Sequence, residues 1–284
     1  MKTLLAIVNE PKESKGFLQY VTGMALSLSA QVKVLTVFTP ANYPMGMTDN
    51  SGFGTFEMMR NQEKLIIESK NILEKYIDEV TDKIANPVFV EVISEIGFAA
   101  EKAGDLVSKN NADMLVLEGQ QDNGFWMQSS SNMDVIEKVD CPVWIIPKGE
   151  SYKPFTHIVY ATDYNREDTA NLKKLINTFP HYSPHITALH ITDSIDFEER
   201  IKKDGFIETV QKQTDYKPLV VKALYQGEQH NLTELLNDFA LKNEADLLVL
   251  LKENKSFFNR IFSKSKTREL LKITVLPVLI YHEK

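Results

Sequence analysis

Phrases that recur in the same order in the two halves of the chain constrain its fold more than any other feature. Four pairs correspond: TLLAIV (3–8) with THIVYAT (156–162), VKVLTVF (32–38) with ITALHIT (186–192), NADMLVLEG (111–119) with EADLLVLLK (244–252), and CPVWIIPK (141–148) with LPVLIYHE (276–283). Any two α/β units share apolar strands, but matching phrases in matching order predict a duplicated unit. The polar segment KGESYKP (148–154) is typical of a linker. We therefore predict two domains, at residues 1–148 and 155–284.

The first half alternates short apolar runs with longer amphipathic stretches. The runs are rich in Val, Ile and Leu without polar alternation, which is typical of strands covered on both faces. Strands are expected at 3–8, 32–38, 87–93, 113–117 and 142–147. Helical spacing predicts helices at 16–29, 63–83, 99–110 and 133–139. This alternation predicts an α/β fold with a parallel sheet.

Composition and charge exclude several classes of protein. The 284-residue chain is 43% hydrophobic and 25% charged, the balance of a globular protein. Its net charge of -7 argues against a general nucleic-acid binder. Cys141 is the only cysteine, so no disulfide can form within the chain and a cytoplasmic location is expected. No apolar run approaches the ~18 residues of a membrane span, and the N-terminus lacks a signal-peptide cleavage site.

The phrases NADMLVLEG…EKVDCPVWIIP and EADLLVLLK…LLKITVLPVLIY resemble the universal stress protein family in its tandem two-domain form. The resemblance covers the chain from Lys2 to His282. It implies two tandem copies of an open five-stranded parallel sheet flanked by helices. This fold is Rossmann-like, of the adenine nucleotide α-hydrolase type. It also implies that the last strands, Cys141 to Pro147 and Leu276 to Tyr281, pair and form an internal pseudo-dimer.

One branch of this family binds ATP through a glycine loop after the fourth strand, with an Asp at the end of the first strand. Glycines let backbone N–H groups approach phosphates closely. In the second copy the three glycine positions hold Leu251, Asn254 and Lys264, followed by Ser265. Asp163 remains at the end of the first strand. The motif is therefore degenerate, although its length is intact.

The first copy departs further from the ATP-binding pattern. Asn9 replaces the Asp, and the glycine positions hold Glu118 and Gln121. A negative charge at Glu118 would repel phosphate, so no ATP site of the family type is expected there.

Two interpretations stay open for the second copy. Asp163, Asn254, Lys264 and Ser265 are candidate ligand-binding residues, because a helix start with serine and lysine can bind an anion through side chains. The alternative is a solvated charged helix with Ser265 as its N-cap, and this second interpretation is favoured.

The other candidate residues are weaker indications of a functional site. His181 and His185 are spaced four apart, but Pro180 and Pro184 predict a loop rather than a metal-binding helix, and no metal site is expected. His190 falls within a strand, where it can be buried and hydrogen-bonded. Cys141 is expected to pack in the core. The insert at 41–60, rich in Met and Phe, is either a flap over the sheet's carboxyl edge or core capping.

The sequence favours a non-catalytic stress-response protein that acts by binding a partner protein or a small ligand, with no cofactor. The stress role is implied by the resemblance alone. The alternative is a sensor of ATP or another anion through the second copy only. An enzyme ranks last, because no nucleophile, acid–base pair or metal set stands at a readable spacing. A homodimer is left open.

Overall fold

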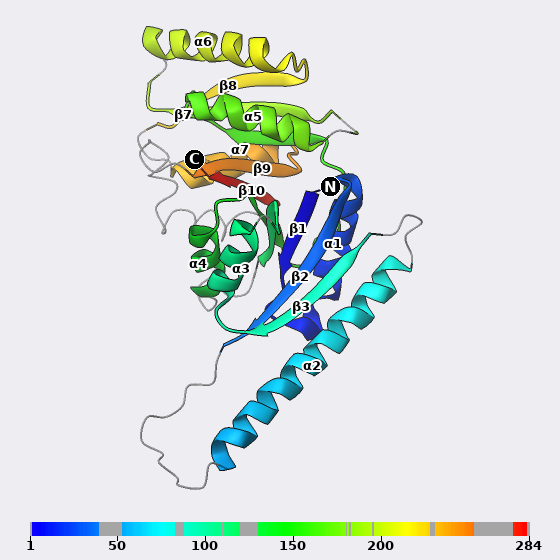
Figure 1. Cartoon of the computed structure of the whole chain (residues 1–284). Helices are drawn as coiled ribbons and strands as arrows, with labels where there is room; N and C mark the ends of the chain where they lie inside the picture. Colours follow the sequence, from blue (N-terminus) through cyan, green and yellow to red (C-terminus); the bar gives the residue numbers. More distant parts are fainter. Residues whose placement is uncertain are drawn as a thin grey trace. The chain divides into compact units, whose positions relative to one another are not determined.

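The computed structural model describes residues 2–39, 53–82, 88–109, 111–119, 130–179, 181, 183–194, 196–227, 231–252 and 275–282. Within these residues most strands are followed by a helix, and almost all neighbouring strands are parallel (Figure 1). The predicted α/β fold, with a mostly parallel sheet flanked by helices, is confirmed. No helix in the described ranges is long and apolar enough to cross a membrane.

The first repeat contains five strands, four α-helices and a short 3-10 helix among its described residues. In chain order they are β1 (Lys2–Ile7), η1 (Pro11–Glu13), α1 (Lys15–Ser27), β2 (Ala30–Phe38), α2 (Phe53–Thr81), β3 (Val90–Ile96), α3 (Ala99–Ser108), β4 (Met114–Gly119), α4 (Ser130–Lys138) and β5 (Val143–Pro147). Helix α1 packs against α2, and α3 against α4.

The second repeat follows the same order of strands. Its described elements are β6 (His157–Ala161), α5 (Arg166–Thr178), β7 (His185–Thr192), α6 (Phe197–Thr214), β8 (Leu219–Tyr225), α7 (Leu232–Lys242), β9 (Leu247–Lys252) and β10 (Val278–His282). Helix α5 packs against α6, as α1 does against α2 in the first repeat.

The chain divides into two compact units whose limits differ from those of the sequence repeats. The first unit comprises 1–118, 129–139 and 149–152, and the second comprises 119–128, 140–148 and 153–284. The first unit holds four parallel strands in the order β3-β2-β1-β4, and the second holds β5-β10-β9-β6-β7-β8. The last strand of the first repeat therefore belongs to the second unit, while the domain limits at 148 and 155 stay a prediction.

Strand β5 pairs antiparallel with β10, as expected for the last strands of the two copies. Val278 lies opposite Ile145, and Ile280 lies opposite Val143. All other strand pairs in the second unit are parallel among the described residues.

Equivalent aspartates fix the start of the first strand in each repeat. Asp113 Oδ2 accepts a hydrogen bond of 2.7 Å from the Thr3 backbone N–H. Asp246 Oδ2 accepts one of 2.8 Å from the Thr156 backbone N–H. The Asp of the "AD" dipeptide shared by NADMLVLEG and EADLLVLLK therefore has the same structural role in both repeats, which supports the duplication.

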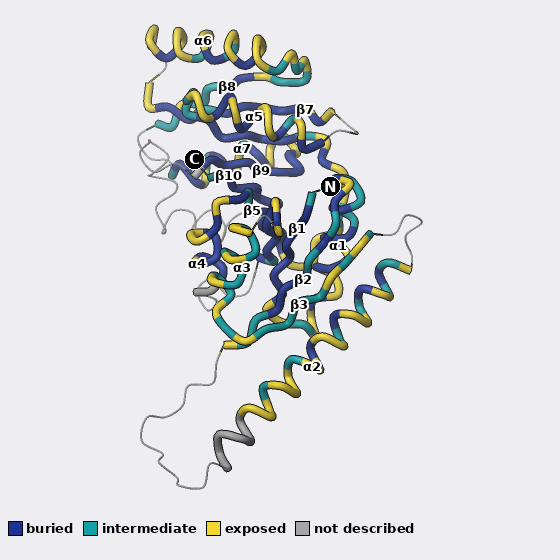
Figure 2. Tube along the Cα trace, in the orientation of Figure 1, coloured by how far each residue is buried: buried dark blue, intermediate teal, exposed yellow. Residues whose placement is uncertain are grey.

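The core of the second unit includes an aromatic residue of the first repeat. Trp144, on β5, is fully buried and stacks on Phe155 with ring centroids 5.5 Å apart. Its ring also meets Phe179 edge-on at 6.4 Å. In both units the strands are mostly buried, whereas the helices expose their outer faces (Figure 2).

Some elements differ from the sequence predictions. Helix α2 begins at Phe53, ten residues before the predicted start at Glu63, so part of the insert at 41–60 is helix. Strand β3 begins at Val90 rather than Pro87. No phrase of the repeat predicted β8, an edge strand in which Val221 is the only buried residue. Residues 41–52 of the insert lie outside the described part of the chain.

Candidate functional site

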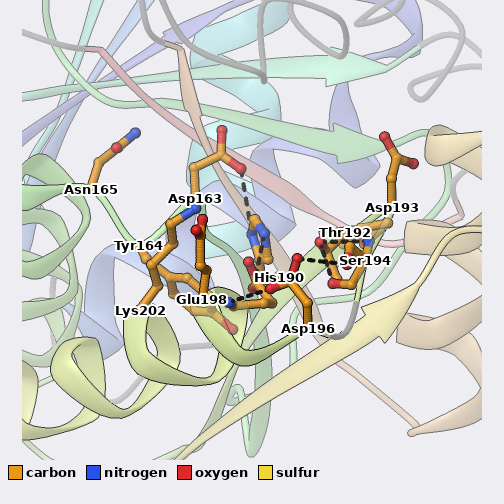
Figure 3. Close-up of a pocket in the computed structure, with 12 residues that line it drawn as sticks. Asp163, Tyr164, Asn165, His190, Thr192, Asp193, Ser194, Asp196, Glu198 and Lys202 are labelled. Atoms are coloured by element: carbon orange, nitrogen blue, oxygen red, sulfur yellow. Dashed lines mark hydrogen bonds and ion pairs between the residues drawn. The ribbon is translucent and has the colours of Figure 1, made fainter.

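A pocket of about 410 Å³ lies in the second unit, at the carboxyl ends of β6 and β7 and the start of α6 (Figure 3). Ligands usually bind at this edge of open α/β sheets. The lining residues are Asp163, Tyr164, Asn165, His190, Ile191, Thr192, Asp193, Ser194, Asp196, Glu198, Glu199 and Lys202.

A buried carboxylate holds the turn that follows β6. Asp168 accepts hydrogen bonds from the Tyr160 hydroxyl (2.8 Å), the Thr162 hydroxyl (2.8 Å) and the backbone N–H groups of Asp163 (3.0 Å) and Asn165 (3.1 Å). Burial raises the pKa of the Asp168 carboxyl, and these hydrogen bonds oppose the rise. Asp168 therefore fixes the turn that presents Asp163 to the pocket.

His190 lies between two acidic residues in the wall of the pocket. Its Nδ1 is 2.7 Å from the Thr162 carbonyl oxygen, so Nδ1–H donates to that carbonyl. Asp163 Oδ1 is 3.5 Å from Nδ1, and Glu199 Oε1 is 3.4 Å from Nε2. Burial lowers the pKa of the imidazole, against the opposing effects of the Thr162 carbonyl and the Glu199 carboxylate. The neutral ring thus carries its lone pair at Nε2, facing Glu199.

Tyr164 closes one side of this cluster. Its backbone takes a left-handed conformation with φ 61°, which is uncommon for a residue other than glycine. Its ring centroid lies 4.4 Å from that of His190 and 5.2 Å from that of Phe206. The hydroxyl is buried and has no hydrogen-bond partner among the described residues. Burial, followed by the charge of Glu199, raises the pKa of the phenol.

The start of α6 carries the acidic side of the pocket. Asp196 caps the helix, because its Oδ1 accepts a hydrogen bond of 2.9 Å from the Glu199 backbone N–H. The Ser194 hydroxyl donates to Asp196 Oδ2 at 2.9 Å. These two bonds, the backbone one first, lower the pKa of the Asp196 carboxyl. The cap places Glu199 on the inner face of the helix, where it is buried.

The pocket is strongly acidic. Among its described lining residues, Lys202 and a neutral His190 stand against five carboxylates, those of Asp163, Asp193, Asp196, Glu198 and Glu199. A cleft lined mainly by one sign of charge concentrates ligands of the opposite sign. Its chemistry thus favours a cation or a hydrogen-bond donor over a phosphate.

Comparison with known proteins fits this architecture. The model of the universal stress protein family matches residues 1–147, just over half of the chain. The chain belongs to the universal stress protein family. No curated protein matches it.

Solved structures resemble this universal stress protein over nearly all of its length. A universal stress protein from Archaeoglobus fulgidus DSM 4304 is 12% identical, with 99% of this chain and 96% of that chain covered and a TM-score of 0.62. A putative one from Pseudomonas aeruginosa UCBPP-PA14 is 11% identical, with 99% and 93% covered and a TM-score of 0.61.

The cytoplasmic domain of a prokaryotic cation chloride cotransporter is also similar. It is 10% identical, with 98% of this chain and 94% of that chain covered and a TM-score of 0.54. At such low identity, these likenesses show the fold alone.

The pocket includes one of the four candidate ligand-binding residues of the sequence prediction. Asp163 lies in its wall, beside His190. Asn254, Lys264 and Ser265 lie outside the described residues, so their part in a site stays a prediction.

Sequence patterns did not predict Tyr164, Glu199 or Lys202 as site residues. A usable pattern was present, because Thr162-Asp163 and Thr192-Asp193 repeat one dipeptide at the ends of neighbouring strands. Parallel strands end at the same edge of a sheet, so this repeated pair marks where the pocket lies.

The end of β1 in the first repeat is built differently. Asn9 replaces the acid, and its Nδ2 donates to Asn132 Oδ1 at 3.3 Å. The Asn132 amide in turn donates to the Glu118 carbonyl oxygen at 3.4 Å. A neutral amide chain therefore stands where the second repeat has the Asp163 carboxylate.

The remaining candidates have structural positions. Cys141 is buried, in keeping with packing. His185 begins β7 at the opposite end of that strand from the pocket, and His181 lies in the turn before it. Among the described residues, no group of three or more His, Cys, Asp or Glu side chains could hold a metal ion.

Proposed function

We propose that this universal stress protein is a non-catalytic, cytoplasmic binding module whose pocket at the ends of β6 and β7 takes a small ligand. The observation that carries the proposal is a preformed pocket at the sheet's carboxyl edge whose walls are polar and mostly fixed by hydrogen bonds. Its volume of about 410 Å³ falls within the ~300–1,000 Å³ of ordinary small-molecule sites. The stress-response role follows from the family.

The arrangement of polar groups supports binding rather than catalysis. A nucleophile needs a base within hydrogen-bond reach. His190 is instead committed to the Thr162 carbonyl through Nδ1 and faces Glu199 through Nε2. The Ser194 hydroxyl donates to the helix-capping Asp196. These contacts hold the walls of the pocket and leave no activated hydroxyl among its described residues.

Sensing of ATP or another anion by the second repeat is the second candidate function. Asp163 favours it, because this residue stands in the pocket at the end of the strand, where the ATP-binding branch also has an Asp. The surrounding carboxylates oppose it, because they repel phosphates. Isothermal titration with Mg-ATP, repeated with Lys264→Ala, tests this candidate. Micromolar binding that weakens in the variant would place a nucleotide in the second repeat.

A blocked pocket tests the proposed function. Asp193 is exposed and lines the pocket, so Asp193→Trp should fill its mouth without disturbing the core. Asp204→Trp is a matched control, because Asp204 is exposed on α6 and does not line the pocket. A metabolite library, including nucleotides, amines and amino acids, is screened by thermal shift against the three proteins.

The proposal expects at least one compound that raises the melting temperature of wild type and of Asp204→Trp, but not of Asp193→Trp. A screen in which every stabilising compound acts equally on all three proteins would rule out the pocket as a ligand site.

A further inference from the structure

We infer that the pocket at the ends of β6 and β7 selects a small organic cation, an alkyl amine or guanidinium compound, which binds beside Glu199. This inference rests on the proposed function and names the ligand class of the same site. It begins from the excess of carboxylates in the pocket wall and from a buried acceptor that lacks a donor.

The buried acceptor is the carboxylate of Glu199. The residue is 8% exposed, and its Oε1 has no hydrogen-bond partner among the described residues. His190 Nε2 lies 3.4 Å from this oxygen. Because His190 donates through Nδ1 to the Thr162 carbonyl, the neutral ring presents a lone pair at Nε2. Two acceptors therefore face each other, and Glu199 Oε1 lacks a hydrogen-bond donor among the described residues.

A buried carboxylate is costly to leave without a donor. An ammonium or guanidinium group supplies several N–H donors and one positive charge, which is what this corner of the pocket lacks. The remaining carboxylates of the wall add attraction for the same charge.

A metal ion fits less well than an organic cation. No set of three or more ligating side chains gathers in the described part of the chain. An alkyl amine needs only one or two acceptors for its head group, and its carbon chain can occupy the rest of the ~410 Å³.

Titration of the full-length protein with spermidine, putrescine and agmatine tests the inference. Glu199→Gln removes the buried charge and keeps the side-chain size. Glu208→Gln is the matched control, because Glu208 lies on the same helix, is exposed and does not line the pocket. At least one amine should bind wild type and Glu208→Gln alike, and its dissociation constant should rise roughly tenfold or more in Glu199→Gln.

A second measurement covers the case in which Glu199→Gln fails to fold. The imidazole NMR signals of wild-type His190 should shift on addition of the amine, while those of His157, which lies outside the pocket, stay unchanged. An amine that binds all three proteins equally would be held by surface charge alone and would overturn the inference.

Two more results would overturn it. One is a charged His190 imidazole in the free protein at neutral pH, because the ring would then supply the missing donor. The other is no binding of any of the three amines. If Asp193→Trp still blocks another compound in that case, the proposed function stands and only the ligand class fails.

Discussion

Single residues hold the turns that carry the pocket walls, and Asp168 is the clearest case. Its carboxylate accepts four hydrogen bonds, two of them from the side chains of Tyr160 and Thr162. Removing it leaves buried donors without an acceptor, which costs about 1–3 kcal/mol for each group left unsatisfied.

We expect Asp168→Ala to lower the free energy of unfolding by about 2–4 kcal/mol. Urea denaturation followed by circular dichroism measures this change. Asp238→Ala is the control, because Asp238 is exposed on α7, and it should change stability by no more than about 0.5 kcal/mol. Equal effects of the two variants would show that Asp168 does not hold the turn.

The titration of His190 gives a second prediction at this scale. Burial lowers its pKa in the folded protein below the ordinary value of 6.5, so the unfolded chain binds more protons between these two values. The contribution of His190 to the free energy of unfolding is fully present above pH 6.5 and is lost as the pH falls through the pKa of the folded state. Asp163, Glu199, Tyr164 and Lys202 are the charged and titratable groups that surround it.

We therefore expect the unfolding free energy of wild type, relative to His190→Gln, to decrease as the pH is lowered from neutral through 6.5. Urea titrations at a series of pH values measure this difference. A difference that instead grows at acid pH would mean that the folded protein stabilises the charged imidazole.

At the scale of elements, the linker after β5 packs against helix α1. The Tyr152 ring meets Tyr20 edge-on at 5.4 Å. A Cβ added to Gly23 would lie 2.9 Å from Tyr152 Cδ1, a contact too close to keep. Gly205, in the middle of α6, has nothing within 4 Å of its added Cβ.

We expect Gly205→Ala to raise stability by about 0.5–1 kcal/mol through helix propensity. Gly23→Ala should lose this gain, because Tyr152 must move, and should speed cleavage of the linker by a protease. Thermal unfolding and limited proteolysis compare the two variants. Equal increases in stability for the two variants, without faster cleavage of the linker, would show that Tyr152 is not held against helix α1.

How far the sequence predicts the elements depends on how deeply each is buried. Strands β1 and β4 are nearly continuous apolar runs because both faces are covered, so their patterns were readable. Strand β8 lies at an edge and buries only Val221, so its pattern gave no comparable indication. The start of α2 was missed because no residue from Met59 to Glu68 is buried.

The site was less predictable than the fold. Asp163 could be found because it aligns with Asn9 at the end of a repeated strand. His190 and Glu199 converge only because Ala161 pairs with Leu189, which brings Thr162 beside His190. A shift of one residue in this register would turn every side chain of β7 to the other face. Sequence periodicity does not determine that register.

At the scale of the whole molecule, the second unit depends on a strand from the first repeat. Trp144 lies on β5 and packs against Phe155 and Phe179 of the second repeat. We expect Trp144→Ala to lower the unfolding free energy of the second unit by about 3–5 kcal/mol, because it leaves a large cavity.

Phe197→Ala is the matched aromatic control, because Phe197 is 75% exposed, and it should change stability by no more than about 0.5 kcal/mol. Denaturant unfolding, with proteolytic fragments assigned to each unit, measures both variants. Loss of the first unit's protection alone would contradict the assignment of β5 to the second unit.

The position of β5 also has a consequence for the order of events during synthesis. Strand β5 ends at Pro147, and its partner β10 begins at Val278, near the end of the chain. The ribosome must translate nearly the whole second repeat before this pair can form. At roughly 5–20 residues per second, the wait is on the order of ten seconds. During that time β5 lacks its β10 partner, and an open edge on an apolar strand is the kind of feature that chaperones bind.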